Sequence, residues 1–120
     1  MTILVLILRV IFGLFFAYIG VMHFLKPRFF NGFIPKPLPK LAVNYVAGFI
    51  EVAIGIGLLF NATAKNAAIG FFILMVVFLP LHVWDLFKEK PAIGSKKIAI
   101  IRLPIQFLLL YIAYLIYSIS

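Results

Sequence analysis

Residues 2–25 read TILVLILRVIFGLFFAYIGVMHFL, and this stretch decides the fold. Its only charged or titratable side chains besides tyrosine are Arg9 and His23, and nearly all the others are apolar. At about 1.5 Å per residue, a helix of this length exceeds the ~30 Å hydrocarbon core of a bilayer. The stretch therefore predicts a membrane-spanning helix. A cleaved signal peptide is the rival interpretation, but Arg9 interrupts the apolar run and no small-residue cleavage site precedes Lys26.

Three further apolar runs, at roughly residues 41–61, 65–87 and 98–118, account for most of the remaining chain. Of the 120 residues, 66% are apolar and 12% are charged, and the mean hydropathy is +1.23. A soluble domain of this length cannot bury so much apolar surface. We therefore expect an all-α fold, a transmembrane four-helix bundle that forms a single domain over residues 1–120.

The three predicted connections differ in composition. The first, residues 26–40, is rich in proline and phenylalanine, so it cannot be regular helix throughout. We expect it to lie along the lipid headgroups. Residues 61–65 predict a tight turn, and residues 88–97 contain Pro91 and Gly94 as helix breakers.

Basic residues are distributed unevenly among these connections. The chain carries 11 Lys and Arg against 3 Asp and Glu, a net charge of +8, but it has hardly any soluble surface on which to bind nucleic acid. Connections 26–40 and 88–97 hold eight of the basic residues, whereas residues 61–65 hold Lys65 alone. Because basic connections stay cytoplasmic, we expect both termini on the exterior of the membrane, which we take to be a bacterial inner membrane. The absence of cysteine excludes disulfides, iron–sulfur clusters and Cys-type zinc sites.

Polar side chains inside the apolar runs are the candidates for function, because a charge at membrane depth needs a partner or a water-filled cavity. Helical rise places Glu51 ~16 Å from the cytoplasmic lysines, with Arg9 and Arg102 each ~8 to 9 Å from it along the membrane normal. We therefore expect Glu51 to form an ion pair with one of these arginines. The same group could also be a ligand or proton site. His23 lies at ~5 Å by the same count and is expected at headgroup level.

The spacing of small and polar residues predicts which helix faces meet. In residues 2–25 and 41–61, glycine and polar residues recur every three or four positions, so they share one face of each helix. Small residues allow close backbone approach and polar residues join helices, so we expect these faces inside the bundle. The stripes are Arg9, Gly13, Phe16, Gly20 and His23 in the first helix, and Asn44, Gly48, Glu51 and Gly55 in the second.

Several motifs resemble those of the DoxX-like family of small four-helix membrane proteins. They are GVMHFLKP with the following IPKPLP, GFIEVAIG around Glu51, and RLPIQ from Arg102 to Gln106. The chain departs from the family pattern near Pro80, where an Asn-containing stretch would be expected. The resemblance implies a membrane bundle and a role as an accessory or assembly subunit, in some members within quinone-linked redox complexes.

We therefore expect an accessory subunit of a larger membrane complex, with no catalytic residues of its own. The alternative is a site for a quinone or other lipophilic ligand that serves a quinone-linked oxidoreductase. The quinone or a bound lipid is then the candidate cofactor, and no metal is expected. A transporter ranks last because no inverted repeat is visible. The expected partners are the lipid bilayer and a larger membrane complex, and the oligomeric state stays open. The candidate ligand-binding residues are Glu51, His82, Arg102, Gln106 and His23.

Overall fold

The computed structural model describes residues 2–34, 36–88 and 95–120. Within these ranges the chain is helical, without a strand, and forms the all-α bundle expected from the sequence. The long helices are α1 (Thr2–Leu25), α2 (Lys40–Leu59), α3 (Ala64–Leu86) and α4 (Lys96–Ile119). Two short 3₁₀ helices, η1 (Pro27–Phe29) and η2 (Asn31–Phe33), lie between α1 and α2.

The ends of the helices differ from the predicted ranges by at most two residues. Helix α2 stops at Leu59 because Phe60 takes an extended conformation (φ −109°, ψ 137°). Helix α4 begins at Lys96, earlier than predicted, because the Ser95 side chain caps it by accepting a hydrogen bond from the Ile98 backbone N–H at 3.2 Å. The predicted breakers Pro91 and Gly94 lie outside the described residues.

Each long helix is long and apolar enough to cross a membrane. Large apolar side chains on the outward faces are exposed in the structure, among them Leu14, Phe49, Ile73 and Phe107. Such a surface is compatible with an integral membrane protein, in which acyl chains cover these side chains.

Helices α1 and α2 cross in close contact through their glycines, as the stripe pattern predicts. A Cβ atom on Gly48 would lie 2.7 Å from the carbonyl oxygen of Gly20, and one on Gly55 would lie 2.5 Å from that of Gly13. Since neither distance leaves room for a methyl group, the four glycines set how closely the two backbones approach.

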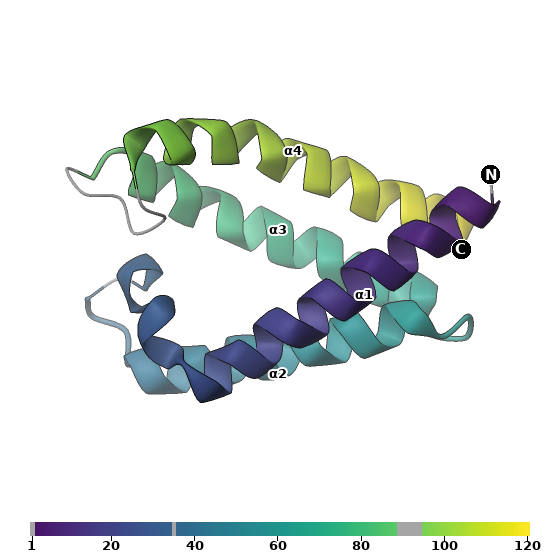
Figure 1. Cartoon of the computed structure of the whole chain (residues 1–120), viewed down its shortest axis with the longest axis horizontal. Coiled ribbons are helices and arrows are strands. Elements are labelled where there is room, and N and C mark those ends of the chain that lie inside the picture. The colour runs from purple at the N-terminus through teal and green to yellow at the C-terminus, as the bar shows by residue number, and fades with distance from the viewer. Residues whose placement is uncertain (1, 35, 89–94) are drawn as a thin grey trace.

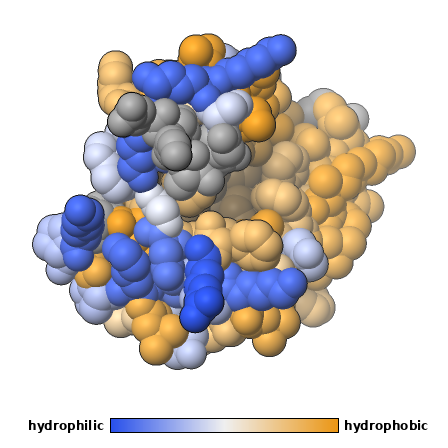
Figure 2. All heavy atoms as spheres, turned by 60° about the vertical axis from the view of Figure 1, so that its left-hand side comes forward, coloured by the Kyte–Doolittle hydropathy of each residue, from blue (hydrophilic) through white to orange (hydrophobic). Residues whose placement is uncertain are grey.

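The bundle consists of two helix pairs, α1 with α2 and α3 with α4 (Figure 1). The pairs converge at the end where the two termini lie and diverge toward the end that holds η1 and η2 (Figure 1). Buried Leu58, Phe71 and Ile116 belong to the apolar core that joins the pairs. Figure 2 shows the end where the helix pairs diverge. Hydrophilic side chains gather there, and the remaining visible surface is largely hydrophobic.

Candidate functional site

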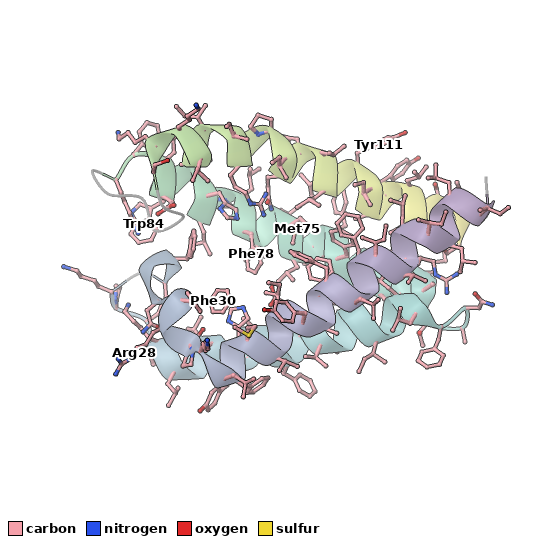
Figure 3. The ribbon with its side chains drawn as sticks, viewed as in Figure 1. Arg28, Phe30, Met75, Phe78, Trp84 and Tyr111 are labelled. Atoms are coloured by element: carbon pink, nitrogen blue, oxygen red, sulfur yellow. The ribbon has the colours of Figure 1, made fainter. Side chains whose placement is uncertain are left out.

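A cavity of about 390 Å³ lies between the two helix pairs, on the side of η1 and η2. Its walls are mainly aromatic and aliphatic, and six phenylalanines contribute to them. In Figure 3, Phe30, Met75 and Phe78 face this space. The volume is within the ~300 to 1,000 Å³ range of small-molecule sites, which are typically apolar with a few placed polar groups. The polar groups here are Asn44, His23, Glu51, His82 and Arg102.

Glu51 contacts His23 on the neighbouring helix, and does not form the expected ion pair with an arginine. His23 Nε2 lies 3.0 Å from Glu51 Oε2, and the two residues are only 7% and 2% exposed. No ion pair joins Glu51 to Arg9 or Arg102, all three of which the structure describes. His23 is therefore a buried member of the polar network and does not lie at the surface of the bundle.

Asn44 orients the His23 ring from the other side. Its amide nitrogen donates to the backbone oxygen of Lys40 at 2.9 Å and to Asn31 Oδ1 at 3.0 Å. A backbone oxygen only accepts, so this contact fixes the amide and leaves Asn44 Oδ1 to accept from His23 Nδ1 at 2.9 Å. With Nδ1 bound to Asn44, the other ring nitrogen, Nε2, faces Glu51.

The segment between α1 and α2 closes this part of the site. The Phe30 ring stacks on His23 with 3.8 Å between ring centroids, and Asn31 binds Asn44 as described. The Phe33 ring meets His82 edge-on at 5.7 Å, and the Gly32 carbonyl accepts a hydrogen bond from Lys88 Nζ. The segment thus contacts both helix pairs. In the sequence, the only signal for Asn31 is an Asn-Gly turn pair in a Pro- and Phe-rich stretch, which does not predict this contact.

The opposite wall carries His82 from α3 and Arg102 from α4. His82 Nδ1 and Arg102 Nη1 are both buried, and neither has a hydrogen-bond partner among the residues that the structure describes. Buried polar atoms without partners are rare in proteins and call for a specific explanation. These two atoms are therefore candidates to bind a ligand in the cavity.

Arg9 serves the other end of the bundle. Its Nε donates to the carbonyl of Leu58 at 2.8 Å and its Nη1 donates to Asn61 Oδ1 at 2.9 Å. These bonds satisfy groups at the C-terminal end of α2, where carbonyls have no helical partner. The predicted pairing of Arg9 with Glu51 is therefore replaced by a capping role.

Gln106 is fully buried but is not one of the residues that line the cavity. Its amide nitrogen donates to the backbone oxygen of Met75 at 2.7 Å, and so joins α4 to α3. This bond gives Gln106 a structural role. Asp85 is also buried outside the cavity lining, with Lys88 Nζ at 3.4 Å from its carboxylate.

The described residues contain no group of three or more His, Asp or Glu side chains that could hold a metal ion. The cavity therefore offers hydrogen bonds, charge and an apolar volume. Such a set can bind and orient a molecule and can hold a proton at the His23–Glu51 pair.

The fold and the site define a small all-helical protein with four apolar helices around a cavity that has polar groups on both walls. A family described as a domain of unknown function (DUF8561) matches residues 12–117, and the chain belongs to this family. No curated protein and no solved structure matches the chain. No DoxX-like family is among the matches, and that resemblance stays a prediction.

Proposed function

We propose that this protein is a membrane-embedded binding protein that holds a lipophilic small molecule in the cavity between its helix pairs. The carrying observation is the combination of aromatic walls with two unpartnered nitrogens, His82 Nδ1 and Arg102 Nη1. An acceptor at the head of a ligand would accept from the guanidinium and from the imidazole tautomer that carries its proton on Nδ1, and the apolar body would fill the volume between the phenylalanines.

In this role the protein binds the ligand, and any reaction of the ligand takes place on another protein. No described cluster provides a metal site, and the predicted role as an accessory subunit fits a protein that stores or presents a ligand. A quinone headgroup is one class of acceptor that could enter, and a quinone-linked oxidoreductase would then be the partner. An acidic headgroup is another such class.

The proposed orientation places both termini on the exterior of a bacterial inner membrane. The support is the concentration of Lys and Arg in connections 26–40 and 88–97. The divergent end of the bundle, with η1 and η2, would then face the cytoplasm. A ligand head near His82 and Arg102 would lie on the cytoplasmic side of the bilayer.

The test is to identify what the purified protein carries. After mild detergent extraction, organic solvent should release one compound in near-stoichiometric amount, which mass spectrometry identifies. Ala47 lines the cavity, so Ala47→Phe should fill part of it and abolish retention of that compound. Ala53→Phe adds the same side chain on the exposed face of the same helix and should retain it. Equal retention by both variants, or release of bulk lipid only, would refute the proposal.

A further inference from the structure

The charge of the cavity can be counted from the groups that line it. Two of these groups, His23 and Glu51, compensate each other. His23 Nδ1 carries a proton because Asn44 Oδ1 can only accept. The 3.0 Å contact between Nε2 and the carboxylate then requires one proton between them, since two lone pairs at this distance would repel. Whether that proton sits on His23 or on Glu51, the pair is neutral overall.

Arg102 supplies the remaining charge. A guanidinium stays protonated in proteins, and within the described part of the chain Arg102 has no hydrogen bond or ion pair. The other described carboxylate, Asp85, holds Lys88 and does not line the cavity. Among the described residues, Arg102 therefore gives the cavity one positive charge that no lining side chain balances, at a depth where an unbalanced charge is unfavourable.

A neutral headgroup and an anionic headgroup differ in whether they neutralise the charge of Arg102. A quinone carbonyl accepts hydrogen bonds from Arg102 and His82 but leaves the positive charge unbalanced. A carboxylate accepts the same bonds and also neutralises the charge, and its two oxygens offer one acceptor for each nitrogen. The unbalanced charge of Arg102 therefore favours a carboxylate over a quinone carbonyl.

We infer that the ligand is a singly charged anionic amphiphile of the fatty-acid type. Its carboxylate binds Arg102 Nη1 and His82 Nδ1, and its acyl chain lies among the phenylalanines that line the cavity. This inference rests on the proposed function, since it assigns the headgroup of the molecule that the cavity holds.

The test compares three probes of similar apolar length, namely dodecanoate, dodecanol and decylbenzoquinone. Each is added to delipidated protein in a neutral detergent at about pH 8, where a free carboxylic acid is ionised. Native mass spectrometry counts the bound probe. We expect dodecanoate to bind at least about tenfold more tightly than dodecanol, the ratio that one charge-assisted hydrogen bond supplies.

Substitutions at Arg102 test whether this residue causes the preference for dodecanoate. Arg102→Gln should remove the preference for dodecanoate over dodecanol, and Arg102→Lys, which keeps the charge, should retain most of it. Arg28→Gln is the matched control, because Arg28 points away from the bundle (Figure 3). If Arg102→Gln fails to fold, the preference of the unaltered protein for dodecanoate over dodecanol still tests whether the headgroup is anionic.

The remaining outcomes are also decisive. If dodecanol or decylbenzoquinone binds as tightly as dodecanoate and Ala47→Phe abolishes this binding, the anionic headgroup is refuted while the proposed function stands. If no probe binds, or if binding survives in Ala47→Phe, the cavity is not the site and both proposals fail.

Discussion

The contact between His23 and Glu51 predicts a strong energetic coupling between α1 and α2. The perturbation is a double-mutant cycle of His23→Leu, Glu51→Leu and the variant with both changes. Each single change leaves one buried polar group without its partner, because the two residues are 7% and 2% exposed. The double change replaces both groups by apolar side chains, which a membrane bundle accommodates readily.

The size of the coupling follows from the geometry. At 3.0 Å, two unit charges attract by about 5 to 6 kcal/mol at an effective dielectric constant of ~20, which is an upper bound. Neutral interhelical hydrogen bonds in membranes average ~0.6 kcal/mol and reach ~1.7 kcal/mol, which gives the lower range. Because Asn44 supports the ring, we expect a coupling of about 2 to 3 kcal/mol, between these limits.

The assay is equilibrium unfolding in mixed micelles of a mild detergent and sodium dodecyl sulfate, followed by far-ultraviolet circular dichroism. Glu51→Gln serves as the control, because a glutamine amide can donate a hydrogen bond to His23 Nε2. This substitution should lower the free energy of unfolding by about 1 kcal/mol or less. If the effects of the two leucine substitutions simply add, the pair does not stabilise the contact and the reasoning is refuted.

Two further predictions concern packing and orientation. Gly55→Leu should lower the free energy of unfolding by about 1 to 3 kcal/mol, because a Cβ at this position would lie 2.5 Å from a backbone oxygen of α1. Gly70→Ala, where the nearest atom is a side-chain carbon at 3.2 Å, is the mild control in the same unfolding assay. Because the chain contains no cysteine, Ser120→Cys and Lys36→Cys each introduce a single thiol. An impermeant maleimide added to intact cells should label only the former, and labelling of the latter would reverse the proposed orientation.

The sequence was sufficient to predict the four helices, because the apolar runs are long and lysine or proline lies near most of the boundaries between them. It was also sufficient to predict the face on which α1 and α2 meet. Small residues recur with helical spacing, and a close approach such as that of Gly55 to Gly13 depends only on the two helices being neighbours.

The partner of Glu51 was predicted wrongly because depth was counted along the backbone alone. That count separates Glu51 from His23 by ~11 Å and brings the arginines nearer. In the structure a Cβ on Gly48 would lie 2.9 Å from His23 Cβ, so His23 meets α2 only one helical turn from Glu51. The lysines from which depth was counted on α1 and α2 therefore do not lie at one level. Side chains lean toward the N-terminus of their helix, so His23 and Glu51 on antiparallel helices lean toward each other and meet at 3.0 Å.

The cavity itself depends on the angle between the helix pairs, which no local pattern encodes. Seen only in sequence, Arg9, Arg102 and Gln106 look alike as polar residues at membrane depth. In the structure Arg9 donates two hydrogen bonds to the protein and Gln106 donates one to a backbone oxygen, so both hold helix ends or helices together. Arg102 donates none within the described residues and faces a cavity with apolar walls. On this difference in partners we assign structural roles to Arg9 and Gln106 and propose Arg102 as the residue whose replacement should change ligand choice while the bundle stays folded.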